Sequence, residues 1–115
     1  MDVVHAVPTE SLSEKLSVQR LSDKLGLTQM RANVFMLAEG SMSRHLHREQ
    51  EELYVVLDGT AIIDVDEARH KLGERDALAV PARAWHRVSN VGLGPLTFLV
   101  VAAPPTAGDA EIEAG

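Results

Sequence analysis

Two histidines separated by a single residue, His45 and His47, are the strongest indication of chemistry in this sequence. Alternate side chains of a β-strand point to the same face of its sheet, so this pair can present two imidazoles side by side. Glu52 follows at the start of an apolar segment, and His86 lies further along the chain. A carboxylate from the next strand and a third imidazole from a later one would complete a set of nitrogen and oxygen ligands. The pattern predicts a metal site with room left for water or a substrate.

Short apolar segments between turn signals surround these residues. Residues 53–57 are β-branched and aromatic and end at Asp58-Gly59, a dipeptide typical of hairpin turns, after which residues 61–65 form the partner strand. Further strands are predicted at 28–38, 76–80, 87–89 and 96–102, with turns at 66–70 and 90–95. Many short strands separated by turns predict an all-β sandwich or barrel.

The chain of 115 residues is long enough for one domain only. Residues 1–27 are predicted to form an N-terminal arm that contributes an extra strand after about Glu14, although its leucines also have rough helical spacing. Residues 28–103 form the predicted barrel. Residues 104–115, with two prolines and Ile112 as their one large apolar side chain, are predicted to be a flexible acidic tail.

Composition excludes several classes of function. A formal charge of −6 and the absence of a basic run speak against a nucleic-acid partner. Without cysteine there can be no disulfide, iron–sulfur cluster or thiol nucleophile, so histidine, aspartate, glutamate or water must hold any metal. The longest apolar run, residues 96–103, is too short to span a bilayer. The first ten residues lack the features of a signal peptide, and we expect a cytoplasmic protein.

The strand at residues 53–57 also bears on assembly. Leu53, Val55 and Leu57 occupy one face of this strand, and the other face carries Tyr54 and Val56. A strand that is apolar on both faces is buried on both, by a second sheet, a helix or another subunit. In a chain this short we expect a homodimer.

The spacing of these residues resembles the two motifs of the cupin superfamily, in its small single-domain (cupin 2) form. The first motif is matched by Gly40, His45, His47, Glu52 and Gly59, and the second by Pro81, His86 and Asn90. The resemblance covers residues 28–102 and implies a double-stranded β-helix, or jelly-roll, barrel. It also implies that His45, His47, Glu52 and His86 are metal ligands. Three imidazoles and one carboxylate suit a divalent Mn, Fe, Co, Ni or Zn ion.

This sequence departs from the family pattern in three places. The interval from Gly40 to His45 is one residue shorter than usual, and Arg75 and Arg83 replace glycines of the second motif. If the backbone at Arg83 keeps a positive φ, arginine costs about 1 kcal/mol relative to glycine. Alternatively the turn relaxes and changes the aim of His86. Both arginines could also lie near the barrel mouth, where they would favour an anionic ligand.

Glu51 competes with Glu52 as the carboxylate ligand. The six residues between Glu52 and Gly59 match the family motif and favour Glu52. Tyr54 shares the face of Glu52, which makes it the candidate catalytic residue, with packing in the core as the alternative. Arg31 or Asn33 are further candidates, depending on the parity of their strand.

The resemblance implies a metal-dependent enzyme, of oxygenase or isomerase type, that acts on a small organic molecule. A non-catalytic module that binds a small ligand or acts as a sensor is the alternative, because the fold serves both kinds of protein. A third reading, a metal-free barrel, draws support only from the arginines at positions 75 and 83.

Overall fold

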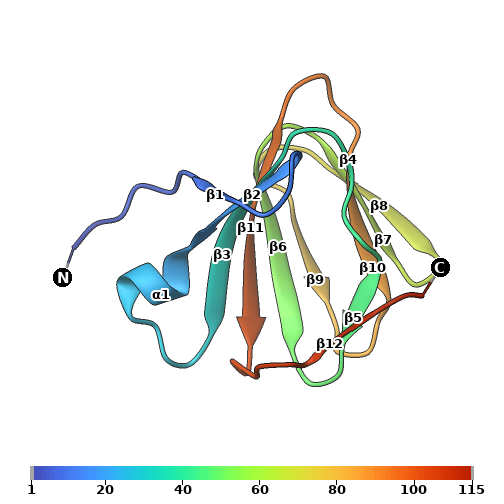
Figure 1. The fold of residues 1–115 in the computed structure, drawn as a ribbon. Coiled ribbons are helices and arrows are strands. Elements are labelled where there is room, and N and C mark those ends of the chain that lie inside the picture. Colours follow the sequence, from blue (N-terminus) through green and yellow to red (C-terminus); the bar gives the residue numbers. More distant parts are fainter. Residues whose placement is uncertain (1, 115) are drawn as a thin grey trace.

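The computed structural model describes residues 2–114 and consists of β-strands with one short helix. The strands are β1 (Glu10–Ser11), β2 (Leu16–Arg20), β3 (Arg31–Leu37), β4 (Gly40–Ser41), β5 (His45–His47), β6 (Glu51–Asp58), β7 (Ala61–Val65), β8 (Ala68–Leu72), β9 (Ala77–Val80), β10 (His86–Asn90), β11 (Leu96–Ala103) and β12 (Ala110–Ile112). They form two antiparallel sheets that lie opposite each other (Figure 1). The larger sheet has the order β1-β2-β3-β11-β6-β9, and the smaller has the order β12-β5-β10-β7-β8, with β4 paired to β10. The predicted all-β jelly-roll architecture is confirmed.

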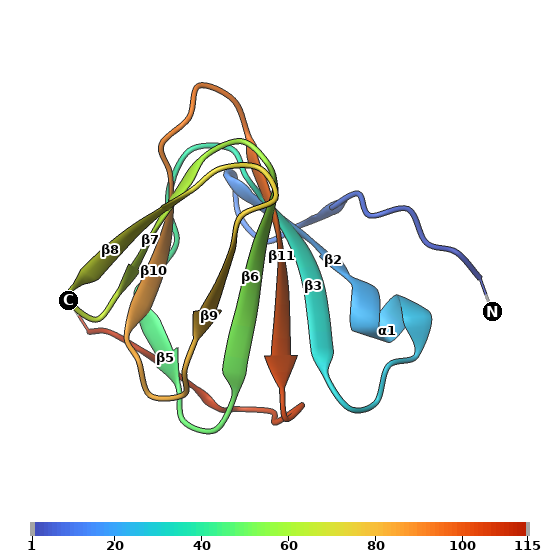
Figure 2. The same cartoon turned by 180° about the vertical axis from the view of Figure 1, so that it is seen from behind.

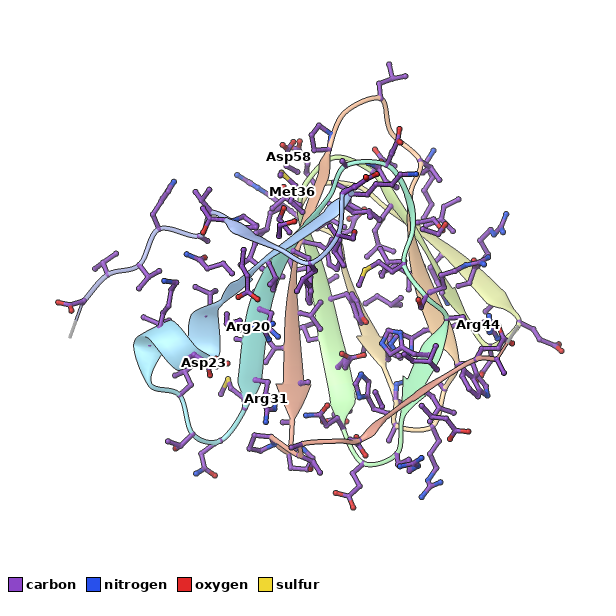
Figure 3. The ribbon with its side chains drawn as sticks, viewed as in Figure 1. Arg20, Asp23, Arg31, Met36, Arg44 and Asp58 are labelled. Atoms are coloured by element: carbon purple, nitrogen blue, oxygen red, sulfur yellow. The ribbon has the colours of Figure 1, made fainter. Side chains whose placement is uncertain are left out.

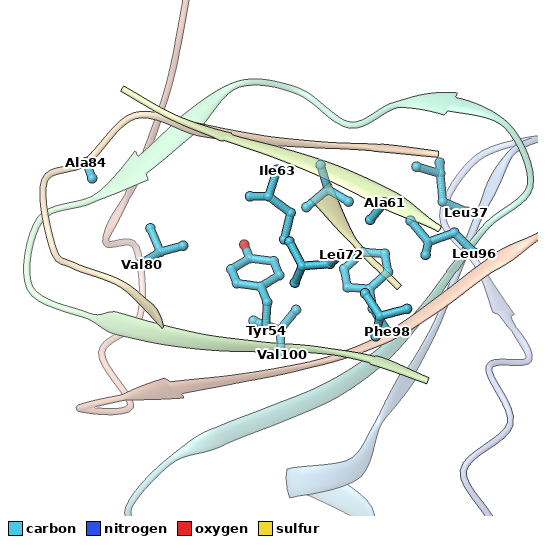
Figure 4. Packing of buried hydrophobic residues seen from close by; sticks show 12 residues of the cluster. Leu37, Tyr54, Ala61, Ile63, Leu72, Val80, Ala84, Leu96, Phe98 and Val100 are labelled. Carbon is cyan, nitrogen blue, oxygen red and sulfur yellow. The ribbon is translucent and has the colours of Figure 1, made fainter. Parts of the chain in front are cut away.

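The core fills the space between the two sheets. Along β11 the buried side chains alternate with half-buried ones, as expected for a strand with one face toward a core. Phe98 of β11 and Ile63 of β7 are each 1% exposed, so the two sheets meet through large apolar side chains. Figure 4 shows the ring of Tyr54 projecting from β6 into the same space, beside Leu72 and Val100.

The N-terminal segment, whose sequence fits both a helix and a strand, contains one of each. Strand β2 pairs with β3, and helix α1 (Leu21–Leu25) follows it directly. Gly26 ends the helix with a φ of 70° and donates its N–H to the Ser22 carbonyl, a left-handed cap that glycine adopts without strain. The helix lies beside β2 and β3 (Figure 2) and contacts β3 on its outer side. Within residues 2–114, no helix is long and apolar enough to cross a membrane.

The turn predicted at residues 66–70 is shorter than expected. Asp66, with a φ of 49°, makes the turn together with Glu67, and β8 begins at Ala68. β8 pairs with β7 as a hairpin and lies at the edge of the smaller sheet. Its exposed Arg69 and Lys71 are typical of edge strands, where charge discourages pairing with another chain. Because of these charges, the sequence of β8 lacks the alternation of apolar and polar side chains that indicates a strand.

The C-terminal segment contains a strand where the sequence predicts a flexible tail. β12 pairs with β5, and the register places Ala110 opposite His47 and Ile112 opposite His45. The pairing depends on the backbone and needs no apolar pattern, which explains why composition does not reveal it. The division into residues 1–27, 28–103 and 104–115 stays a prediction, with β1 and β2 in the larger sheet and β12 in the smaller.

The two arginines that replace motif glycines keep the glycine conformation. Arg75 and Arg83 both have a φ of 69°, in the left-handed region. Each backbone N–H is held by a neighbouring strand: that of Arg75 donates to the Val56 carbonyl at 2.8 Å, and that of Arg83 to the His47 carbonyl at 2.6 Å. The turn before β10 therefore does not relax, and it is hydrogen-bonded to the strand that carries two candidate ligands.

Candidate metal centre

Three strands from the two sheets bring the four predicted ligands together. β5 supplies His45 and His47, β10 begins with His86, and β6 of the opposite sheet supplies Glu52. One potential ligand atom from each residue lies within 4.8 Å of the others. His45 and His86 are direct cross-strand partners, and their ring centroids are 4.2 Å apart. Glu52 is buried, whereas Glu51 is exposed, so the structure brings Glu52 into this cluster.

Backbone carbonyls orient two of the three imidazoles. Nδ1 of His45 lies 3.1 Å from the Ser43 carbonyl, and Nδ1 of His86 lies 2.9 Å from the Ala84 carbonyl. A carbonyl oxygen can only accept, so each Nδ1 carries the proton in these hydrogen bonds. Each ring therefore keeps its Nε2 lone pair for another partner, as a ligating histidine requires.

One buried nitrogen beside the Glu52 carboxylate lacks a hydrogen-bond partner within the described part of the chain. Nε2 of His86, a residue only 1% exposed, lies 2.8 Å from Glu52 Oε1 without forming a hydrogen bond. Nε2 of His47 is 3.5 Å from Glu52 Oε2. Buried polar atoms are normally satisfied, so lone pairs gathered around a carboxylate indicate a site for a cation. Three imidazole nitrogens and one carboxylate are a suitable donor set for a divalent first-row metal.

Protonation states within the cluster also suit a metal. Burial acts to raise the pKa of Glu52, but contact with His86 and the charges of His47 and His45 outweigh it, so this pKa is lowered. Burial lowers the pKa of His45, while its hydrogen bond to the Ser43 carbonyl opposes the shift only in part. An ionised Glu52 and a neutral His45 are the forms that bind metal.

Tyr54 holds the carboxylate from the side of the core. It is 3% exposed, and its hydroxyl donates a hydrogen bond to Glu52 Oε1 at 3.1 Å. Burial, the charge of Glu52 and this hydrogen bond all raise the pKa of Tyr54 well above its ordinary value of 10.0. The phenol is therefore a neutral donor at physiological pH, which suits it to positioning Glu52 and not to accepting a proton.

A cavity of ≈ 580 Å³ is lined by three of the four candidate ligands, His45, His47 and Glu52. Its wall on the larger sheet follows the strand register: Arg31, Ala102 and Glu52 form one row across β3, β11 and β6. The next row is Asn33, Val100 and Tyr54, and beyond it Phe35 and Phe98 make the wall apolar. Arg31 and Asn33 thus lie on the face of β3 that lines the cavity. Arg75 and Arg83, for which the sequence leaves a place near the barrel mouth open, are not among the residues that line it.

Sequence reasoning missed Asp109, a buried residue just before β12. Its carboxylate accepts hydrogen bonds from the backbone N–H groups of Arg48, Glu49 and Gln50 at 3.0–3.1 Å. Burial acts to raise the pKa of Asp109, but these N–H groups and His47 lower it overall. Oδ2 lies 3.8 Å from His47 Nδ1, a buried nitrogen without a hydrogen-bond partner among the described residues. No motif in the sequence points to this aspartate, because its role depends on a contact 61 residues away.

Comparison with known proteins agrees with the jelly-roll fold described above. The family model described as "Cupin domain" matches residues 33–102. A solved structure described as a sugar phosphate isomerase, from Silicibacter pomeroyi, is 32% identical, with a TM-score of 0.79, and the match covers 89% of this chain and 68% of that one. An uncharacterised protein of Methanocaldococcus jannaschii is 26% identical over 70% of this chain and 64% of its own length. The alginate biosynthesis protein AlgA of Pseudomonas putida is 32% identical over 64% of this chain but only 15% of its own length.

Proposed function

The chain belongs to the cupin family, and on that premise we propose that it is a metal-dependent enzyme acting on a small organic molecule. The convergence of His45, His47, Glu52 and His86, the first three of which line a cavity of ≈ 580 Å³, carries this proposal. These residues would hold a divalent Mn, Fe, Co, Ni or Zn ion. Of the two reaction classes expected from the resemblance, isomerase and oxygenase, the 32% identity to a protein described as a sugar phosphate isomerase favours the first.

The bound metal would supply a Lewis acid that polarises an oxygen of the substrate. The chain's own residues then have three tasks. The carbonyls of Ser43 and Ala84 fix the direction of two imidazoles, and the Tyr54 hydroxyl fixes Glu52. Phe35 and Phe98 supply an apolar wall against which an apolar part of the substrate can pack.

Tyr54→Phe tests whether the phenol positions Glu52. We expect weaker metal binding with little change in the folded structure, because the ring stays in place and only the donor to Glu52 Oε1 is lost. Titration with Co²⁺, followed by its visible absorption, measures the affinity. Unchanged affinity together with lost turnover would instead make Tyr54 a catalytic residue.

A specific observation favours a second function, that of a non-catalytic ligand-binding module. Proton transfer in an isomerase needs a titratable group beside the metal. Apart from the four ligands, the titratable side chains that line the cavity are Lys15, Arg31, Glu39 and Tyr54, and the first and third of these form an ion pair at 3.4 Å. This scarcity suits binding without turnover.

Elemental analysis of protein purified without a histidine tag tests the metal centre. We expect about one metal ion per chain, and little in a His47→Ala/His86→Ala double variant. His70→Ala is the matched control, because His70 lies on β8, outside the cluster and the cavity lining. Failure to retain any of the five metals, even after reconstitution, would refute the proposal.

The two functions are separated by following a panel of sugar phosphates by NMR with metal-loaded protein. Conversion that requires the metal and is lost in the double variant supports the enzyme. Stabilisation against thermal unfolding by a panel member, without conversion, supports the binding module.

A further inference from the structure

Arg31 lies in the cavity wall and has no ion-pair partner among the residues that the structure describes. Both Arg31 and Lys15 line the cavity, and Lys15 is neutralised by Glu39. Within residues 2–114, Arg31 has neither an ion pair nor a side-chain hydrogen bond, whereas five other arginines contact carboxylates: Arg20, Arg44, Arg48, Arg69 and Arg87. Figure 3 shows Arg31 at the start of β3, next to β11. A guanidinium in a cavity wall without a protein partner is free to bind a ligand.

The strand register sets the distance between Arg31 and the candidate metal ligands. Arg31 and Glu52 flank Ala102 in one row across the sheet. Neighbouring strands lie about 4.8 Å apart, so the backbones at Arg31 and Glu52 are roughly 10 Å apart. The small side chain of Ala102 leaves the space between them open. A ligand lying over Ala102 would have the metal at one end and the guanidinium at the other.

Asn33 adds a second polar group on the same side. It is two residues along β3 from Arg31, lines the cavity and is half-buried. Its amide can donate to an oxygen that the guanidinium also contacts. The row beyond it begins with Phe35, so polar donors on β3 are confined to the end near the metal cluster.

Charge and geometry together select an anion. The whole chain has a formal charge of −6, which by itself would repel anions. In the cavity, Lys15 and Glu39 cancel. A divalent ion, once bound, would outweigh the single charge of Glu52, and Arg31 would then make the local charge distinctly positive. The planar fork of arginine donors matches carboxylate and phosphate oxygens in a bidentate manner.

We propose that Arg31, assisted by Asn33, forms an anion-binding subsite for a phosphate or carboxylate group of the ligand. This inference rests on the proposed function, because it assigns the opposite end of the same ligand to the metal. It narrows the ligand class to small molecules that carry an anionic group at one end and an oxygen donor at the other.

Three probes with the same three-carbon skeleton test the subsite: glycerol 3-phosphate, glycerate and glycerol. Binding to metal-loaded protein is followed by NMR titration. We expect at least one anionic probe to bind about tenfold or more tighter than glycerol, as for a charge-assisted hydrogen-bond pair. The tighter of the two anions identifies phosphate or carboxylate as the group recognised.

Arg31→Gln should abolish the preference for anions, and Arg83→Gln should retain it. Arg83 is the matched control, because it is exposed, outside the cavity lining and without an ion pair among the described residues. Thermal unfolding should be the same for Arg31→Gln and the parent, since Arg31 is exposed and has no partner to lose. An anion preference that survives in Arg31→Gln, or that falls equally in both variants, overturns the subsite.

The same titrations distinguish a failure of the anion subsite from a failure of the proposed metal centre. The comparison of Arg31→Gln with Arg83→Gln decides the subsite, whereas the metal content of the His47→Ala/His86→Ala variant decides the metal centre. An anion preference that depends on Arg31 but persists in metal-free protein supports the subsite even if the metal proposal fails. Equal binding of anions by the parent and Arg31→Gln, with metal present, overturns the subsite alone.

Discussion

Arg83→Gly is expected to stabilise the protein, because arginine stands at a backbone position that suits glycine. With a φ of 69°, Arg83 lies in the left-handed region, where crowding by the Cβ atom costs roughly 1–2 kcal/mol. Glycine removes this strain but has more freedom in the unfolded chain, which offsets about 0.5–1 kcal/mol of the gain. The free energy of unfolding should therefore rise by about 0.5–1 kcal/mol, or ~2–4 °C in Tm for a domain of this size.

The matched control is Arg83→Ala, which removes the side chain and keeps the Cβ atom. Both variants retain the backbone N–H that donates to the His47 carbonyl at 2.6 Å, so the turn stays attached to β5 in each. The Arg83 side chain is exposed and makes no hydrogen bond or ion pair within residues 2–114, so Arg83→Ala should leave stability nearly unchanged.

Urea unfolding of metal-free protein measures the effect, because bound metal would add its own stabilisation. We expect a higher midpoint for Arg83→Gly at an unchanged m-value, and the same metal affinity as the parent. If Arg83→Gly is no more stable than Arg83→Ala, the turn does not store the strain that its φ implies. Arg75→Gly, with the same φ of 69°, repeats the test at an independent turn.

Three further predictions concern the site, acid stability and assembly. Asp109→Asn should weaken Co²⁺ binding about 10–100-fold, because it removes the negative charge beside His47 Nδ1. Spectroscopic titration measures the Co²⁺ affinity, and an affinity within threefold of the parent's would contradict the prediction. The metal-free protein should lose stability as the pH falls below about 6.5. The folded-state pKa values of His45 and Glu52 lie below their ordinary values of 6.5 and 4.5, so the unfolded chain binds more protons than the folded one. A urea midpoint that is constant from pH 7.5 to pH 4 would contradict this. The exposed Leu53, on the outer face of β6, should lie in a homodimer interface, so Leu53→Lys should change the mass by light scattering from two chains to one; a monomeric parent would refute it.

The proximity of His45, His47, Glu52 and His86 follows partly from strand geometry, and partly from the resemblance to the two cupin motifs. His45 and His47 share a face by the period of the strand, and Asp58-Gly59 correctly marks the end of the strand that carries Glu52. Gly59 has a φ of 93°, and a Cβ atom there would lie 2.8 Å from the Pro95 carbonyl, so a single side chain would disturb this turn. Such local rules can be read without the fold.

Features that depend on contacts between distant segments could not be read in this way. Lys71 belongs to β8 despite its charge, because pairing with β7 and a position at the edge of the sheet outweigh composition. β12 forms by backbone pairing with β5, and Asp109 acts on a loop that lies far away along the chain. The face of β3 on which Arg31 lies likewise depends on the register of β3 against β11, which local sequence rules do not give.

The pairing of β5 with β12 also has a consequence for how the protein is made. The loop after β5 acquires Asp109 only once the chain has grown by 61 residues beyond Arg48, and β5 acquires its neighbour β12 slightly later. At ribosomal rates of about 5–20 residues per second, that delay is roughly 3–12 s. During this interval the nascent chain displays its histidines in an incomplete barrel. The support that Asp109 and β12 give to His47 is therefore expected only after residue 112 has been translated.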